Sequence, residues 1–168
     1  VMVAHMNIPS LDSTANLPST LSKPIVTNLL KEELGFKGLI ISDAMGMKGV
    51  VKYFPNGEAD VQALLAGNDV LELSENSKRG VKLIRKAIRK NQLSWEGINE
   101  RVKKVLVAKY WAGLANPYQP DLQNLVSKLN RAEAVALKQQ LADEAVTVLG
   151  SMEGIHSLSK TKKTVLIS

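Results

Sequence analysis

Short apolar segments alternate with amphipathic helical segments along residues 1–111, and this alternation constrains the fold more than any other feature of the sequence. The apolar segments cover residues 1–6, 38–42 and 69–73. A continuous apolar run of this kind is typical of a strand that is buried on both faces of a parallel sheet. We therefore predict an α/β fold in which helices connect parallel strands.

Helix start and stop signals lie between the predicted strands. Ser22 is placed to cap a helix that has Pro24 in its first turn, and Gly35 is placed to end it. Further helices are predicted over residues 58–66, 77–90 and 95–111. Ser94 is a plausible cap for the last of these. Residues 43–57 contain glycines without helical periodicity, and we expect an irregular segment there.

Two architectures share this alternation, the (β/α)8 TIM barrel and the doubly wound sheet. The predicted strands begin near residues 1, 38 and 69, a spacing that suits a barrel in which roughly 250 residues hold eight units. A nucleotide-binding sheet needs a glycine-rich phosphate loop, and neither GxGxxG nor GxxxxGK[ST] follows any of these strands. The barrel is therefore favoured, with about three of its βα units in this chain.

The net charge of +6 has a local source. Its basic residues are Lys78, Arg79, Lys82, Arg85, Lys86, Arg89 and Lys90, and Arg101, Lys103 and Lys104 follow soon after. Such a segment either binds phosphate groups or forms the solvated side of an amphipathic helix. The solvated side is favoured, because no aromatic residue interleaves with these charges and no nucleic-acid motif is present. We expect no nucleic-acid partner.

Composition excludes several kinds of site. The chain has no cysteine, which removes disulfides, thiol nucleophiles and thiolate metal sites. His5 and His156 stand alone without metal-ligand spacing, so we expect neither a metal nor another cofactor. No apolar run approaches the roughly 18 residues that a membrane span needs.

A change in composition after residue 112 indicates a domain boundary. The stretch "GLANPYQP" contains one glycine and two prolines and is predicted to begin a linker. Asp121 and Asn130 are expected to cap further helical stretches, with Glu133 completing a capping box on Asn130. Strands are predicted over residues 145–149 and 164–168.

These signals divide the chain into three parts. Residues 1–115 are expected to form part of a barrel, residues 116–144 a helical linker, and residues 145–168 the start of a second α/β domain. The chain begins and ends inside predicted strands, whereas chain ends usually lie in polar segments. We therefore expect a fragment of a longer protein.

The acidic residues sort by their position relative to the strands, because catalytic groups of a barrel stand at the carboxyl ends of its strands. Asp43 directly follows the predicted strand 38–42, Asp12 lies on the loop after the first strand, and Glu72 lies late in the third. Asp69 precedes its strand and is expected at the opposite face, where it would serve stability. Two interpretations of Asp43 are open. It is either a nucleophile, base or metal ligand, or it is a loop carboxylate that caps backbone amides.

Four other residues also have a structural alternative. His5 falls near the carboxyl end of the first strand, where a hydrogen-bonded core histidine is the simpler interpretation. Met45 and Met47 are more simply gap-filling side chains. Glu72 is as compatible with a partnered structural carboxylate as with a substrate contact.

Several segments in succession resemble glycoside hydrolase family 3, in its β-N-acetylhexosaminidase branch. They are "VMVAHMNIPSLD", "PSTLSKPIVTNLLKEELGFKGLIISDAMGMKGV", "EADVQALLAGNDVLEL" and a closing "RVKKVLVAKYWAGL". The resemblance runs from Val1 to about Pro117 and is specific, because the segments occur in the family's order and spacing. It implies barrel strands six to eight, followed by a linker and the first elements of the family's α/β sandwich domain.

The resemblance also implies an activity. Asp43 corresponds to the nucleophile of retaining enzymes, which form a covalent glycosyl-enzyme that water then releases. Ala44 and Met45 resemble the hexosaminidase branch, whereas the β-glucosidase branch usually has Trp after the nucleophile. His5 in "VMVAH" is implied to line the pocket, and Met45 to contact the substrate. The implied substrate of the parent is a terminal β-linked N-acetylglucosamine on a cell-wall fragment, muropeptide or chitin-type oligosaccharide.

One part of the branch's machinery is not in this sequence. Its general acid/base is a His on a "KHFPGHG" loop before the sixth strand, and neither His5 nor His156 lies in such a motif. We therefore expect the chain by itself to be inactive, and to self-associate through its open strand edges. A β-glucosidase or xylosidase of the same family and a non-catalytic carbohydrate-binding or scaffold barrel remain as alternatives.

Overall fold

A computed structural model describes residues 1–116, 119 and 122–147 of the chain. The chain divides into two compact units, residues 1–118 and residues 119–168, and each is described by itself. Among the described residues no helix is both long and apolar enough to cross a membrane.

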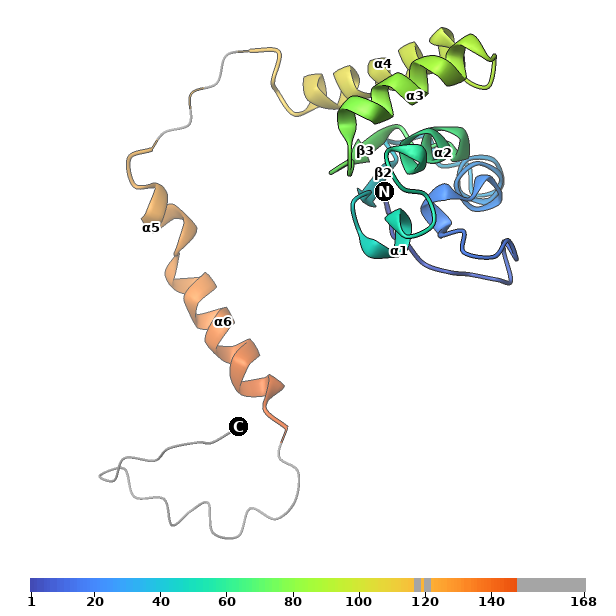
Figure 1. The fold of residues 1–168 in the computed structure, drawn as a ribbon. Helices are drawn as coiled ribbons and strands as arrows, with labels where there is room; N and C mark the ends of the chain where they lie inside the picture. Colours follow the sequence, from blue (N-terminus) through green and yellow to red (C-terminus); the bar gives the residue numbers. More distant parts are fainter. Residues whose placement is uncertain (117–118, 120–121, 148–168) are drawn as a thin grey trace. The chain divides into compact units, whose positions relative to one another are not determined.

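The first unit is built on a parallel sheet of three strands in the order β1-β2-β3 (Figure 1). The strands are β1 (Met2–Val3), β2 (Ile41–Ala44) and β3 (Val70–Glu72). Met2 lies opposite Ile41, and at the far end of the sheet Ala44 lies opposite Glu72. The parallel α/β arrangement predicted from the alternation is confirmed.

The strands differ in extent from the prediction. β1 ends at Val3 because hydroxyl groups, and not a neighbouring strand, bind the backbone that follows it: the Ser19 and Thr20 hydroxyls donate to the Ala4 carbonyl. β2 begins later than predicted and extends to Ala44. Asp43 therefore lies within β2. The expectation that Asp43 directly follows the strand is wrong, because the strand ends at Ala44 and not at Ser42.

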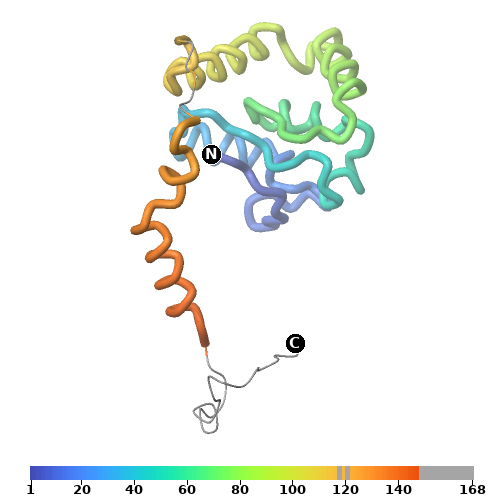
Figure 2. Tube along the Cα trace, turned by 90° about the vertical axis from the view of Figure 1, so that its left-hand side faces the viewer, coloured from blue at the N-terminus to red at the C-terminus, as the bar shows by residue number. Residues whose placement is uncertain are grey.

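Helices connect each strand to the next. Between β1 and β2 lie the short helix η1 (Ser19–Leu21) and η2 (Pro24–Glu33), and between β2 and β3 lie α1 (Lys48–Val51) and α2 (Glu58–Ala66). After β3 come α3 (Ser77–Arg89) and α4 (Trp95–Trp111), which Figure 2 shows as successive green and yellow segments. The short α1 lies within the segment predicted to be irregular.

Several predicted helix ends are confirmed by their hydrogen bonds. The Ser22 hydroxyl accepts the Ile25 N–H at 3.3 Å, and the Ser94 hydroxyl accepts the Gly97 N–H at 3.0 Å. Gly35 has φ +65°, the left-handed conformation that favours glycine at the end of a helix. η2 differs from an ordinary α-helix, because the Leu34 N–H reaches back five residues to the Leu29 carbonyl at 2.9 Å.

Two groups of buried apolar side chains form the core, and α2 contributes to both. One consists of Leu21, Met45, Val50, Ala59 and Ala63, and the other of Val3, Val26, Ile40 and Ala66. α2 contributes the small side chains Ala59 and Ala63 to the first group and Ala66 to the second, so it packs closely against both. α3 packs on α2 through a glycine contact, since a Cβ on Gly57 would lie 2.7 Å from the Gly80 nitrogen.

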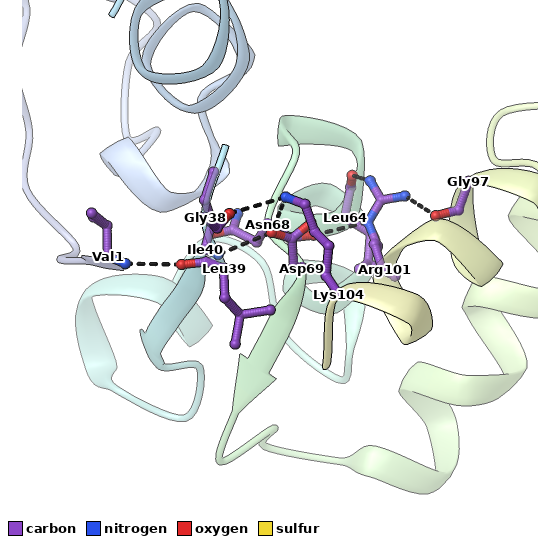
Figure 3. Close-up of polar contacts among 10 residues, drawn as sticks. All are labelled: Val1, Gly38, Leu39, Ile40, Leu64, Asn68, Asp69, Gly97, Arg101 and Lys104. Carbon is purple, nitrogen blue, oxygen red and sulfur yellow. Dashed lines mark hydrogen bonds and ion pairs between the residues drawn. The ribbon is translucent and has the colours of Figure 1, made fainter. Parts of the chain in front are cut away.

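A network of buried polar groups closes the amino end of the sheet (Figure 3). The Asp69 carboxylate accepts the Ile40 N–H at 2.9 Å and pairs with the Lys104 ammonium at 2.8 Å. The Arg101 guanidinium donates to the Asn68, Leu64 and Gly97 carbonyls at 2.7–2.9 Å. α4 is thus fastened to the segments that enter β2 and β3.

The second unit contains α5 (Leu125–Leu129) and α6 (Ala132–Ala145), and none of the residues of either helix is buried. The capping box predicted at Asn130 is wrong: the Asn130 side chain donates to the Val126 carbonyl at 2.9 Å and closes α5 instead of opening α6. The strand predicted over residues 145–149 is wrong at its first residue, because Ala145 ends α6. Asp121 and residues 148–168 lie outside the described residues.

Candidate active site

The carboxyl ends of the three strands are joined in one row by hydrogen bonds. The His5 Nε2 lies 3.0 Å from the Ala44 carbonyl, which links the segment after β1 to the end of β2. The Met45 N–H donates to the Glu72 carbonyl at 2.8 Å, and the Gly46 N–H donates to the Leu73 carbonyl at 3.0 Å. This row forms the face at which a barrel places its catalytic groups.

Asp43 is the half-buried third residue of β2, in the middle of this row. One of its carboxylate oxygens, Oδ1, accepts the Ala44 N–H at 2.8 Å. Among the described residues this is the one hydrogen bond of the Asp43 side chain, so Oδ2 is left to interact with another molecule. A carboxylate held on one side by a backbone amide and open on the other is suited to act as a nucleophile or a base.

His5 lies two residues beyond β1 and is half-buried, with both ring nitrogens engaged. Nδ1 lies 2.8 Å from the Thr20 hydroxyl, and Nε2 faces the Ala44 carbonyl. A carbonyl only accepts, so Nε2 carries a proton and donates it. These contacts match the hydrogen-bonded histidine that the sequence left open as the simpler alternative.

Met45 is buried, with 1% of its surface exposed, and packs against Leu21, Val50 and Ala63. A side chain in this position has almost no surface to offer a sugar. The arrangement therefore matches the gap-filling interpretation of Met45, and its implied contact with substrate gains no support. Met47, two residues further along the chain, exposes 48% of its surface.

The other candidate carboxylates have different surroundings. The Ser22 hydroxyl and the Thr14 N–H both donate to Asp12, and these bonds, led by that of Ser22, hold the pKa of Asp12 below its ordinary value. Asp12 thereby fastens the loop after β1 to the start of η2. Glu72 is half-buried, and its backbone N–H donates to the Ser42 hydroxyl at 2.9 Å.

A hollow of about 290 Å³ lies beside His5. It is lined by His5, Asn7, Asn16, Leu17, Pro18, Gly49 and Tyr53. The structure therefore places His5 in a hollow with polar neighbours, whereas neither Asp43 nor Met45 is among the lining residues. The amides of Asn7 and Asn16 and the phenol of Tyr53 are suited to bind hydroxyl groups.

Sequence reasoning missed Thr20 and, apart from His5, the residues that line this hollow. Thr20 is fully buried, and its hydroxyl lies between His5 Nδ1 and the Ala4 carbonyl at 2.8 and 2.9 Å. The signal was present in the polar run "PST", which lies outside any predicted helix or strand. The pairing was not readable, because 15 residues separate His5 from Thr20.

No group of three His, Cys, Asp or Glu side chains that could hold a metal ion occurs in the part of the chain that the structure describes. The chemistry available at the strand ends is that of a carboxylate, a hydrogen-bonded imidazole and neutral donors.

Comparison with known proteins identifies relatives of this arrangement. The N-terminal domain of glycosyl hydrolase family 3 matches residues 1–108. A β-N-acetylglucosaminidase/β-glucosidase of Cellulomonas fimi is 24% identical over 170 residues, which cover 96% of this chain and 30% of that protein.

Two solved structures share the fold. A family 3 β-N-acetylglucosaminidase from Paenibacillus sp. superposes with a TM-score of 0.79 and 30% identity, over 96% of this chain and 31% of that one. A β-glucoside phosphorylase gives a TM-score of 0.79 at 25% identity, over 94% of this chain and 30% of that one. The chain therefore spans about a third of the length of these relatives, and its α/β fold is similar to that of the family's barrel domain.

Proposed function

The chain belongs to glycosyl hydrolase family 3, and we propose that the protein containing it is a retaining β-N-acetylglucosaminidase whose nucleophile is Asp43. The observation that supports this proposal is the position of Asp43. Its carboxylate lies at the carboxyl end of the central strand, with one oxygen held by the Ala44 N–H and the other open.

The proposed reaction has two steps. Asp43 Oδ2 attacks the anomeric carbon, and the bond between that carbon and the leaving oxygen breaks while an acid outside this chain protonates the leaving group. Water then attacks the same carbon and gives a proton to the group that acted as the acid, the ester to Asp43 breaks, and the sugar leaves with its original configuration. The hydrogen bond from the Ala44 N–H fixes the direction of the open oxygen. The carboxylate therefore loses less rotational freedom when it reaches the transition state.

His5 and Thr20 are proposed to position the nucleophile strand. The His5 ring donates to the Ala44 carbonyl, next in sequence to Asp43, and Thr20 holds the ring from the other side. The ring also lines the hollow that contains Asn7 and Tyr53, and the proposed sugar-binding surface lies there.

The sugar is proposed to be N-acetylglucosamine because of Ala44 and Met45, which resemble the hexosaminidase branch. A glucoside is the second candidate, since the relative from Cellulomonas fimi carries both activities in its name. Release of nitrophenol from the N-acetyl-β-glucosaminide and from the β-glucoside, measured on the full-length protein, separates the two. Faster turnover of the glucoside would contradict the proposed substrate, and no turnover of either would favour a non-catalytic barrel.

The same assay tests whether water or phosphate accepts the sugar in the second step. Because a β-glucoside phosphorylase shares the fold, the reaction is run with and without inorganic phosphate. We expect the rate and the free sugar product to be unchanged by phosphate. Formation of a sugar 1-phosphate would replace water by phosphate in the second step.

Residues 1–115 are proposed to be the last three βα units of the family's barrel, with residues 116–144 as a helical linker and residues 145–168 as the start of an α/β sandwich domain. The 168-residue chain alone is then expected to be inactive and to self-associate, because β1 and β3 are the outer strands of the sheet. Sedimentation at micromolar concentration tests this. A compact monomer would show that the outer edges are covered within the chain.

A further inference from the structure

One face of α3 carries a continuous stripe of positive charge, here called the α3 stripe. Its residues are Lys78, Arg79, Lys82, Arg85, Lys86, Arg89 and Lys90. All seven are exposed. At 100° per residue they fall within an arc of about 140°, on a helix about 20 Å long. The buried residues of α3, Gly80 and Ala87, lie outside this arc and face α2.

The α3 stripe accounts for the whole net charge of the chain. The chain has 22 basic and 16 acidic residues, and residues 77–90 hold seven basic residues and no acidic one. The rest of the chain thus has 15 basic against 16 acidic residues and is close to neutral. A charge that serves solubility alone would not need to be concentrated on one side of one helix.

Within the part of the chain that the structure describes, no residue of the stripe forms an ion pair with a carboxylate. Lys104 and Asp69, at the amino end of the sheet, do form one. Glu58, an exposed carboxylate of α2, lines a hollow of about 260 Å³ between α2 and α3 together with Lys86 and Lys90. It forms an ion pair with neither residue, so the seven charges have no paired counter-charge among the described residues.

This arrangement carries a cost in helix stability. Like charges four residues apart occur at 78/82, 82/86, 85/89 and 86/90, and each such pair destabilises a helix by about 0.2–0.5 kcal/mol. Lys78 and Arg79 also lie in the first turn, where the helix dipole disfavours cations. The same dipole favours the cations of the last turn. The helix dipole therefore does not explain why cations extend along the whole helix. A local rule broken without internal compensation is typical of a functional surface.

We propose that the α3 stripe binds an anionic sugar polymer, one whose residues carry carboxylate, sulfate or phosphate groups. The inference rests on the proposed function, because a glycosidase is expected to meet a sugar polymer. It adds a binding surface outside the strand ends. α3 begins at Ser77, five residues after β3 ends at Glu72, so the chain enters α3 from the end of the sheet that includes Asp43.

The composition of the stripe favours this polymer over two other polyanions. A membrane-surface helix inserts an apolar face into the lipid, whereas the apolar face of α3 packs on α2. Single-stranded nucleic acid is held by aromatic side chains between the basic ones, and α3 contains none. Four lysine ammonium groups and three arginine guanidinium groups on flexible stems suit a hydrated polymer with repeating acidic groups.

The test measures polymer binding by two matched variants of the full-length protein. The stripe variant carries Lys82→Gln, Arg85→Gln, Lys86→Gln and Arg89→Gln. The control carries Lys23→Gln, Lys37→Gln, Lys103→Gln and Lys109→Gln, which are exposed and remove the same charge from other elements. Glutamine is a good helix former, so α3 is expected to remain folded, and far-ultraviolet circular dichroism checks this.

Dextran sulfate and polygalacturonate are the anionic probes, and unmodified dextran is the neutral one. We expect the stripe variant to bind both anionic probes at least about tenfold more weakly than the wild type, and the control no more than about twofold more weakly. The negative slope of log K against log salt concentration should become shallower by about three, because four charges are lost. Equal binding by the stripe and control variants would overturn the proposal.

Two further measurements distinguish an anionic sugar polymer from other polyanions, and test the binding surface separately from the proposed enzyme activity. Tighter binding to phosphatidylglycerol vesicles or to DNA than to the sugar polymers, at the same ionic strength, would overturn the choice of partner. Turnover of a small neutral nitrophenyl glycoside should be unchanged in the stripe variant. An inactive wild type that still binds dextran sulfate through the stripe would refute the enzyme and retain the binding surface.

Discussion

At the amino end of the sheet the Asp69 carboxylate is 3% exposed and is held by the Ile40 N–H and the Lys104 ammonium. At the carboxyl end the Asp43 carboxylate is half-buried, and its side chain has one hydrogen bond, to the neighbouring Ala44 N–H. The two residues are of the same type and lie at opposite ends of neighbouring strands. The number of hydrogen-bond and ion-pair partners, and not the residue type, distinguishes the carboxylate that stabilises the fold from the one that has an open oxygen.

The cations around Asp69 strengthen the contrast. Burial lowers the pKa of Arg101 and of Lys31, and the charge of Asp69 opposes that effect in both. One buried carboxylate thus serves several cations that belong to different helices. No comparable group of cations surrounds Asp43 among the hydrogen bonds of the described residues.

The largest effect is expected from Asp43→Asn in the full-length protein. An amide cannot form the ester intermediate, so kcat should fall on the order of 10³-fold or more, while the melting temperature stays within about a degree or two of the wild type. Steady-state kinetics and thermal melts on one preparation measure both quantities. Activity close to that of the wild type would remove Asp43 from the mechanism.

Asp69→Asn should produce the opposite pattern. The amide retains the shape but leaves the Lys104 ammonium without its carboxylate, which should cost about 1–3 kcal/mol of unfolding free energy. Turnover of the folded protein should change little, because Asp69 lies at the amino end of its strand. Glu100→Gln, an exposed carboxylate on α4, is the matched control and should leave the melt unchanged. A large fall in kcat with an unchanged melting temperature would reverse the comparison.

The sequence predicted this contrast only in part. Asp69 could be placed at the stability end because it precedes an apolar run, and Ser22, Gly35 and Ser94 marked helix ends through local chemistry. Partners distant in sequence were not readable. Lys104 is 35 residues from Asp69, and Thr20 is 15 residues from His5.

The error in the length of β1 has the same physical origin. β1 was predicted too long because the hydroxyls of Ser19 and Thr20, which bind the backbone after Val3, belong to a later segment. The position of Met45 next to Asp43 likewise left its surroundings open, and the structure buries its side chain in the core. A motif fixes which residues are adjacent along the chain, whereas burial depends on the elements that pack around them.

An effect of similar size on stability is expected from Gly80→Ala, which tests whether α2 and α3 pack as closely as the structure indicates. A Cβ on Gly80 would collide with the Asp60 carboxylate, so the substitution should cost about 1–3 kcal/mol through overpacking. Gly49→Ala is the control, because a Cβ there meets no atom within 4 Å. Denaturant unfolding of both variants measures the difference, and equal midpoints would show a looser contact.

The smallest effect is expected from Asp60→Asn, and it depends on pH. Burial raises the pKa of Asp60 above its ordinary value of 3.8, and Glu75 adds to the rise, although the Ser74 hydroxyl donates to it at 2.6 Å. A folded pKa above the unfolded one means that the folded state binds more protons, so this group favours folding below pH 3.8. That contribution is lost as the pH rises through the folded pKa.

The Asn variant lacks this titration and can still accept the Ser74 hydroxyl. It should therefore gain slightly in stability relative to the wild type as the pH rises from 3.8 to 7, and the gain should disappear at lower pH. Glu58→Gln, an exposed carboxylate in the same first turn of α2, should show no such dependence. A wild type that gains on the variant with rising pH would contradict the direction of the pKa shift.

The backbone bonds between the loops after β2 and β3 have a consequence for how this protein could change over evolution. The Met45 and Gly46 N–H groups donate to the Glu72 and Leu73 carbonyls, so no side chain is needed to keep the two loops together. Met47 and Leu73 expose 48% and 70% of their surfaces beside these bonds. Mutations can therefore accumulate at both positions and remodel the rim, while the main-chain frame that carries the central carboxylate is inherited unchanged.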